Sequence, residues 1–279
     1  MPKPSNWQSF TLPTQSETHK LLTEFSDADN ALAVEMWDKS TGLRGLLTAR
    51  RLASVRMNRP KGEKDFVYDQ VTGKYRDTVT GRVLSEKQLR NAVARVSAEA
   101  QKRLKEETRQ LIAGTIMFAV WYTRSRNIMK ALYKTVWVLW LGGFLFDDET
   151  QREFFYLFML LQFKRFDDFT IALDSGKQIM NGTAVTRAGW YGRYGNALFQ
   201  NIKLYLAFLW GHDEARRVLG MNEDHCHDYT TKKTHEFTPG CVELADRGWV
   251  PIQQMVPLGG ASCRSNCLCS LETRRRPNP

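Results

Sequence analysis

The stretch SEKQLRNAVARVSAEAQKRLKEETRQLI occupies residues 85–112 and carries the strongest structural signal in the chain. Ser85 precedes Gln88 by three residues, which is the spacing of a capping box at the start of a helix. Apolar side chains then recur every three or four residues, at Leu89, Val93, Val96, Ala100 and Leu104. Because this period places them on one face of a helix, the stretch predicts a long amphipathic helix that ends near Ile112.

The helical pattern continues beyond this stretch and predicts a mainly α chain. We expect helices over 121–141 and from 148 or 149 to about 173, the second closed by Gly176. A further helical run is expected over 182–219.

Upstream of the long helix, residues 66–84 predict a small hairpin of short strands. The pairs Thr72-Gly73 and Thr80-Gly81 lie eight residues apart within this segment. Glycine adopts the positive φ of a tight turn without steric cost, so each pair is typical of a turn between strands.

The composition changes along the chain and predicts three parts. Residues 1–65 contain four of the nine prolines and are poorly periodic, which indicates an extended or loosely packed basic arm. Residues 66–220 are the expected helical body. Residues 221–279 are the expected small cysteine-rich module, which ends in a basic tail.

The chain is strongly basic, with a formal net charge of +10 and a pI near 9.4. This excess predicts attraction to an acidic partner such as nucleic acid, an anionic membrane or an acidic protein surface. The candidate contacts are five arginines that lie among or just after apolar residues with short helical periodicity: Arg44, Arg50, Arg51, Arg56 and Arg59. A solvated charged face is the commoner explanation of such a pattern.

Two apolar stretches, 135–146 and 154–163, invite comparison with membrane helices. Each is shorter than the roughly 20 residues that span a bilayer, and charged residues flank both. They therefore predict core segments, or a hydrophobic hairpin that a partner covers, and no membrane span. The N-terminus lacks the pattern of a secretory signal, so we expect a reducing compartment, which favours metal binding over disulfides.

All five cysteines lie in the last third of the chain, at Cys226, Cys241, Cys263, Cys267 and Cys269. A chain that avoids cysteine for 225 residues and then clusters it uses thiols for one local task. That task is either to bind a metal or to cross-link a segment rich in loops.

Zinc is the favoured interpretation of this cluster, in a structural role. The cysteines, together with His225, His227 and His235, exceed the four ligands of a tetrahedral site. The favoured ligands are Cys226, Cys241, Cys263 and either Cys267 or Cys269, which would hold together a segment with little core of its own. Disulfides or reduced thiols are the alternatives.

Short motifs in the last third occur in a particular order. They are Glu214-Ala-Arg-Arg-Val-Leu-Gly220, His225-Cys226, Cys241-Val-Glu-Leu-Ala245, Gly248-Trp-Val-Pro-Ile252 and Cys263-x-x-Asn266-Cys267-x-Cys269-x-Leu-Glu272. In this order the chain resembles the C-terminal part of tailed-bacteriophage minor head, or head-morphogenesis, virion proteins. Motifs further upstream, such as Thr72-Gly-Lys-Tyr-Arg-Asp77, extend the resemblance to roughly residues 66–273.

This resemblance implies a virion protein without enzymatic activity, placed in the capsid or near the portal and made in the cytoplasm of a host bacterium. The implied partners are other virion proteins, namely the portal, the major capsid protein or neighbouring copies. Packaged DNA is a further candidate partner.

A competing hypothesis is a nonstructural zinc-containing protein that binds nucleic acid. In that case the basic segment from Arg44 to Arg109 would lie on phosphates, and the cysteine module would act as a scaffold. A hydrolase or transferase is disfavoured because the sequence contains no Ser/His/Asp grouping, glycine-rich phosphate loop or His-Glu-x-x-His motif.

Overall fold

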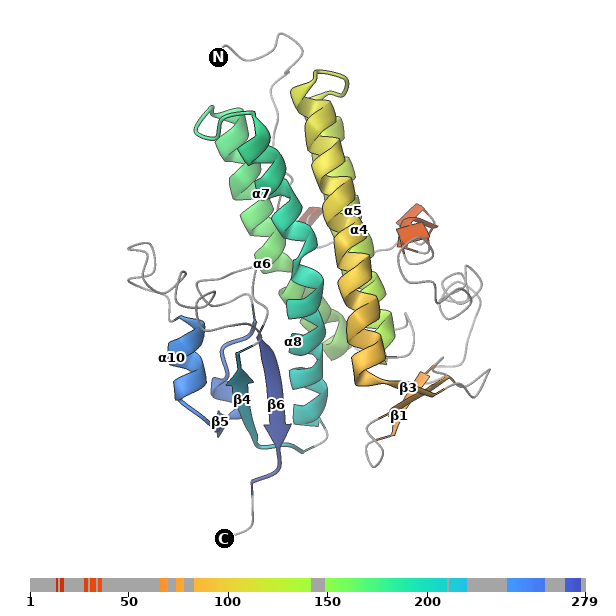
Figure 1. Cartoon of the computed structure of the whole chain (residues 1–279), viewed down its shortest axis with the longest axis vertical. Coiled ribbons are helices and arrows are strands. Elements are labelled where there is room, and N and C mark those ends of the chain that lie inside the picture. Colours follow the sequence, from red (N-terminus) through yellow and green to blue (C-terminus); the bar gives the residue numbers. More distant parts are fainter. Residues whose placement is uncertain are drawn as a thin grey trace. The chain divides into compact units, whose positions relative to one another are not determined.

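The computed structural model describes residues 14, 16–17, 28–29, 31–33, 35–36, 66–69, 74–77, 83–141, 149–209, 211–219, 240–258 and 269–276 (Figure 1). Of this part 72% is helical, so the prediction of a mainly α chain is confirmed. The chain divides into two compact units, residues 1–193 and residues 194–279. None of the helices in the described part is long and apolar enough to cross a membrane.

The first unit contains a three-stranded antiparallel sheet at the position of the predicted hairpin. Its strands are β1 (Phe66–Asp69), β2 (Lys74–Asp77) and β3 (Val83–Ser85), in the order β1-β2-β3. Strand β2 therefore pairs with both neighbours, with Asp77 opposite Phe66 and Lys74 opposite Ser85. The predicted Thr-Gly turns fall between these strands in the sequence and lie outside the described residues.

Helix α4 spans Glu86–Ile112, as the sequence predicts. Its capping box is present: the hydroxyl of Ser85 accepts from the backbone N–H of Gln88, and the Gln88 side-chain oxygen accepts from the backbone N–H of Ser85. The predicted apolar stripe is at most 1% exposed at Leu89, Val93, Val96, Ala100 and Leu104. Burial of this stripe fixes which face of α4 meets the core.

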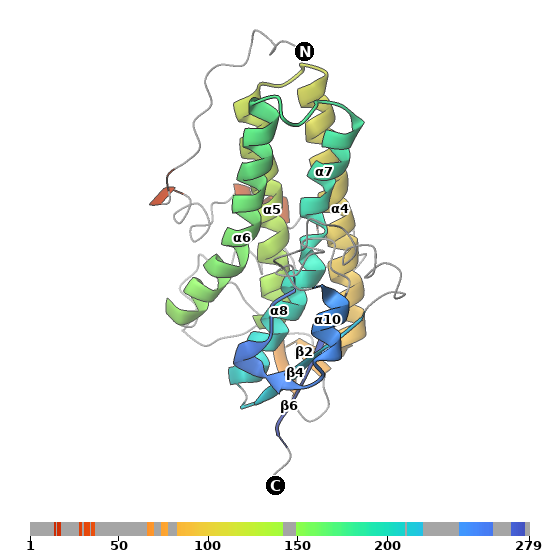
Figure 2. The ribbon, with the colours of Figure 1, turned by 90° about the vertical axis from the view of Figure 1, so that its left-hand side faces the viewer.

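Helix α7 (Gly182–Gly192) packs closely along α4 (Figure 2). A Cβ atom at Gly192 would lie 2.5 Å from the backbone nitrogen of Gln101, so the two backbones meet where α7 has no side chain. A Cβ atom at Gly189 would instead lie 2.5 Å from Cε of Lys105, which belongs to a flexible side chain. The approach of α7 to α4 thus depends on glycine most strictly at Gly192.

Helices α5 (Phe118–Leu141) and α6 (Glu149–Asp174) also agree with the predicted helices. The turns that follow α4 and α6 each contain a glycine with positive φ, 72° at Gly114 and 75° at Gly176, a conformation that favours glycine. Closure of the second helix at Gly176 is therefore confirmed. Both turns lie at the same end of the helices (Figures 1 and 2).

An aromatic cluster forms the core between these helices. The ring centroid of Trp121 on α5 lies 5.4 Å from that of Phe166 on α6, and Phe166 lies 5.1 Å from Tyr191 on α7. The indole N–H of Trp121 donates to the hydroxyl of Thr108 on α4 over 3.1 Å, so this buried polar atom is satisfied. One cluster therefore joins helices α4, α5, α6 and α7.

A short part of the N-terminal region packs on this unit. Residues 28–29, 31–33 and 35–36 are helical, and Ala33 and Met36 are fully buried. Arg103 of α4 forms an ion pair with Glu35, with 3.0 Å between Nη2 and Oε1. The region expected to be a loosely packed arm therefore contains a packed segment.

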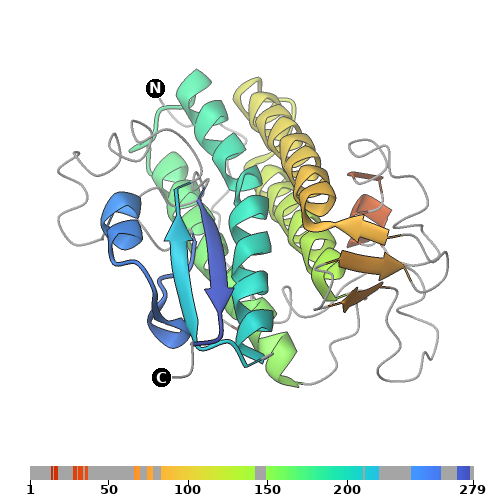
Figure 3. The same cartoon turned by 60° about the horizontal axis from the view of Figure 1, so that its bottom comes forward.

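The second unit is built on another three-stranded antiparallel sheet, with the order β5-β4-β6. Strand β4 (Glu214–Val218) lies between β5 (Val250–Pro251) and β6 (Ser270–Arg274). Figure 3 shows β4 in cyan beside β6 in dark blue. Helix α8 (Tyr194–Leu209) contacts β6, helix α10 (Cys241–Asp246) contacts β4, and the short 3-10 helix η2 (Ile252–Gln254) follows β5.

The helical run expected over 182–219 is wrong in its last part. It ends at Leu209, and residues 214–218 form a strand because β5 and β6 pair with them on both sides. Helix α8, which the sequence placed in the helical body, belongs to the second unit. There Gln200 accepts from the N–H of Leu271 on β6 over 3.2 Å.

Candidate functional site

The buried side of the C-terminal sheet brings together Arg217 and Cys241, which are 24 positions apart in the chain. Arg217 on β4 is 2% exposed, and Cys241, the first residue of α10, is 3% exposed. Nη1 of Arg217 donates a hydrogen bond to Sγ of Cys241 over 3.4 Å, and Nη2 donates to the carbonyl of Val256 over 2.7 Å. One arginine therefore ties β4 to α10 and to the segment after η2.

Cys269 is also buried, directly before β6. Strand β6 pairs with β4 so that Ser270 lies opposite Val218 and Leu271 opposite Arg217. This register places Cys269 beside the end of β4. Two of the five predicted metal ligands, Cys241 and Cys269, thus belong to segments that adjoin the same strand.

The other predicted ligands, Cys226, Cys263 and Cys267, lie outside the described residues, as do His225, His227 and His235. Within the ranges that the structure describes, no three His, Cys, Asp or Glu side chains gather as a metal site requires. Cys241 and Cys269 could supply two of four ligands to a tetrahedral zinc ion. The zinc site therefore stays a prediction.

The outer side of the same sheet carries opposite charges around Trp249. Arg216 pairs with Glu272 over 2.7 Å, and Arg274 pairs with Glu214 over 2.9 Å, each across β4 and β6. The guanidinium carbons of Arg216 and Arg274 lie over the Trp249 ring, 4.8 and 4.2 Å from its centroid. This face can stack with planar groups, although both arginines already have carboxylate partners.

The carboxyl of Glu214 interacts with two arginines on this side of the sheet. It accepts hydrogen bonds from Nε of Arg274 over 2.9 Å and from Nε of Arg276 over 3.2 Å. These bonds, first that from Arg274, lower the pKa of Glu214 below its ordinary value because they stabilise the charged form.

The predicted contacts to nucleic acid or another acidic partner all lie outside the described residues: Arg44, Arg50, Arg51, Arg56 and Arg59. Arg275 and Arg276, the last two residues that the structure describes, are basic and exposed.

Sequence reasoning missed a buried polar network between α5 and α6. The hydroxyl of Tyr122 donates to Oδ1 of Asp167 over 2.8 Å and accepts from Nη1 of Arg126. Arg126 is 2% exposed, and its guanidinium lies 5.0 Å from the ring centroid of Phe163. Burial raises the pKa of Tyr122 and of Asp167 because it disfavours their charged forms. The phenol hydroxyl thus bridges a buried cation and an acid.

Two buried lysines follow Arg126 along α5. Lys130 and Lys134 follow Arg126 at four-residue intervals and are 3% and 1% exposed. Side chains at this spacing share one face of a helix. Basic residues that recur at that interval along one helix face were the signal that could have revealed the network. The N-terminal segment takes part, because Lys130 forms an ion pair with Asp29.

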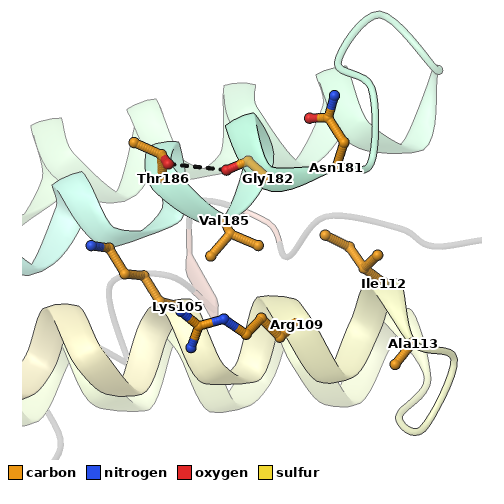
Figure 4. A pocket seen from close by; sticks show the side chains of 8 residues that line it. All are labelled: Lys105, Arg109, Ile112, Ala113, Asn181, Gly182, Val185 and Thr186. Carbon is orange, nitrogen blue, oxygen red and sulfur yellow. Dashed lines mark hydrogen bonds between the residues drawn. The ribbon is translucent and has the colours of Figure 1, made fainter.

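A groove of about 510 Å³ lies between α4 and α7 in the first unit (Figure 4). Apolar walls are supplied by Ile112 of α4, by Ala113 directly after this helix and by Val185 of α7. Lys105 and Arg109 of α4 are its charged side chains, and no carboxylate is among the residues that line it, all of which the structure describes. The groove is therefore apolar and positively charged.

Comparison with known proteins finds no match among family models, curated proteins or solved structures. The class that the fold defines is a mainly α protein with a small C-terminal sheet unit that buries two cysteines.

Proposed function

We propose that the chain is a structural component of a tailed-phage virion, a minor head protein in the capsid or near the portal. It acts through contacts with other virion proteins and has no enzymatic activity. Zinc, held by the C-terminal cysteines, has a structural role in this proposal. The support comes from the motifs by which the chain resembles such proteins and from the way those motifs pack.

The observation that carries the proposal is that four of the motif segments pack into one unit. These segments form β4, α10, the stretch from β5 into η2, and β6. Their buried residues are Ala215, Arg217, Cys241, Leu244, Ile252, Cys269 and Leu271. Motifs that are separate in the sequence thus share one core. This supports a structural relationship to the virion proteins that carry such motifs over a chance likeness of short sequences.

The surface of the first unit supports a role in protein contacts. Ile112, Met117 and Ile179 are 36%, 54% and 66% exposed, and they lie in or beside the turns at one end of the helices. Clustered exposed hydrophobic side chains are typical of a surface that is covered in an assembly.

Quantitative mass spectrometry of particles purified from the source tests the proposal. We expect the chain at a reproducible ratio to the major shell protein, and that ratio also gives its copy number. Absence from the particles, together with abundance in the producing cells, would reject the structural role.

The alternative is a nonstructural zinc-containing protein that binds nucleic acid. The net charge of +10 favours it, as does the contact of Trp249 with Arg216 and Arg274, because aromatic rings and arginines stack on bases. In that case the isolated chain binds nucleic acid, and its affinity falls steeply as the salt concentration rises. Binding that is absent at low salt would reject this alternative.

A further inference from the structure

We propose that the groove between α4 and α7 binds a peptide segment of a neighbouring protein, and that this segment combines apolar side chains with carboxylates. The inference deepens the proposed function, because it names the chemistry of one protein partner. It rests on that function only for the class of protein from which the segment comes.

The apolar part of the groove calls for an apolar occupant. Ile112 projects from α4 and Val185 from α7 into the space between the helices (Figure 4). Met117 and Ile179, both more than half exposed, lie in the turns that adjoin these residues. Met117 and Ile179 do not line the groove itself. A single exposed hydrophobic residue is ordinary, whereas Ile112 in the groove and two more in the turns at the same end of the helices indicate a contact surface.

The charges of the groove call for carboxylates on that occupant. Lys105 and Arg109 stand four residues apart on α4 and share a helix face. Lys105 makes no ion pair with any described residue, and its stem lies against Gly189. Arg109 pairs with Glu106 over 3.1 Å, but both side chains are more than half exposed, so the pair is weak and can be exchanged.

A free phosphate or a nucleic-acid backbone fits this groove less well than a peptide. The start of α7 could offer backbone N–H groups to an anion, but Asn181 already accepts hydrogen bonds from two of them. Its side-chain oxygen accepts from the N–H of Thr183 over 2.9 Å, and its carbonyl accepts from the N–H of Ala184 over 3.0 Å. The apolar walls, formed by Ile112, Ala113 and Val185, would gain nothing from phosphate.

Photocrosslinking of the full chain in the cells that naturally produce it tests the proposal. The probe, p-benzoylphenylalanine, replaces Thr186, an exposed residue that lines the groove, or Lys164, an exposed residue of α6 that does not. We expect Thr186, but not Lys164, to crosslink a peptide that carries apolar residues and at least two carboxylates within about one helical turn.

Charge reversal provides the second measurement. Replacing both groove cations, Lys105→Glu with Arg109→Glu, should lower the crosslink from position 186 about tenfold or more, because it places like charges together. The exchange Lys105→Arg with Arg109→Lys should retain it. If the double reversal unfolds the chain, as circular dichroism would show, Arg109→Glu alone replaces it, since Arg109 is 58% exposed.

Crosslinking to nucleic acid, crosslinking to a segment without carboxylates, an unchanged yield after charge reversal, or no crosslink specific to position 186 would each overturn the proposal. The crosslink is measured in producing cells and does not require purified particles. Absence of the chain from particles would therefore reject the virion role, whereas the crosslinking result decides the groove.

Discussion

Nζ of Lys130 lies 2.9 Å from Oδ2 of Asp29, and the two side chains are only 3% and 8% exposed. The pair joins α5 to a segment 101 residues earlier in the chain. Charges are costly to bury unless they are paired, so the packed N-terminal segment and α5 depend on each other for stability.

Removal of one member of this pair should therefore be strongly destabilising. We expect Asp29→Asn or Lys130→Met to lower the free energy of unfolding by about 3–5 kcal/mol, because each leaves a buried polar or charged partner behind. Replacing both, Asp29→Leu with Lys130→Met, should cost less than either single change. Urea unfolding followed by circular dichroism measures all three.

The control for this series is Glu35→Gln, because Glu35 is about half exposed in its pair with Arg103. Its effect should stay below about 1 kcal/mol. A cost for Asp29→Asn as small as that of the control would contradict the buried pair.

The contact between α7 and α4 makes a second prediction. Gly192→Ala should destabilise the chain by about 1–3 kcal/mol, because the new Cβ atom would overlap the backbone of Gln101. Gly189→Ala should cost less, since the Lys105 stem can move. Gly182→Ala is the matched control on the same helix, with no atom within 4 Å of its new Cβ. Chemical unfolding measures the stabilities. Equal values for the variants at 192 and 182 would show that α7 and α4 approach each other less closely than the structure indicates.

The ion pairs across β4 and β6 predict that the stability of the C-terminal sheet depends on pH. The folded-state pKa of Glu214 is lowered from its ordinary value of 4.5. Its contribution to stability is therefore present above pH 4.5 and is lost as the pH falls through the folded-state value. Hydrogen exchange, corrected for intrinsic rates, should show β4 and β6 losing protection upon acidification, and Glu214→Gln should remove much of that dependence.

Asp167 supplies the internal comparison for this experiment. Burial raises its folded-state pKa, so its contribution favours the folded state at low pH and is lost as the pH rises through that value. Peptides from the α5–α6 contact should therefore show a contribution of opposite sign. Identical pH profiles of the original chain and the Glu214→Gln variant would rule out the role assigned to Glu214.

The zinc prediction is tested by metal analysis of the purified chain. We expect about one zinc ion per chain, and less in Cys241→Ser and Cys269→Ser, because each substitution removes a predicted ligand. A chelator should then raise hydrogen exchange in β4 and β6 while leaving α4 unchanged. A metal-free protein whose strands are fully protected from exchange would contradict the zinc prediction. Thiol alkylation followed by mass spectrometry would then test the disulfide alternative.

Helix α4 could be predicted because its determinants are local. The capping box joins Ser85 and Gln88, and the buried stripe repeats at helical spacing within 28 residues. These hydrogen bonds and this spacing join residues only three or four positions apart, so they can be recognised directly in the sequence. The glycine turn at Gly176 was predictable for the same reason.

Strand β4 could not be predicted, because its partners are distant. The sequence Glu-Ala-Arg-Arg-Val continues a helical pattern when it is read alone, and it becomes a strand by pairing with β5 and β6. The residues of the candidate site also divide into those that the sequence indicates and those that only distant pairing brings together. Cys241 and Cys269 stood out by composition, whereas the contact of Arg217 with Cys241 required the folded sheet.

The sequence by itself thus determined the main helices, the capping box of α4, the glycine that closes α6 and the gathering of every cysteine in one C-terminal segment. Only the tertiary structure decided that Arg126, Lys130 and Arg217 are buried and which groups they contact. The physical reason is that the cost of burying a charge is offset by partners far away in the chain, and no local pattern specifies which partners will be present.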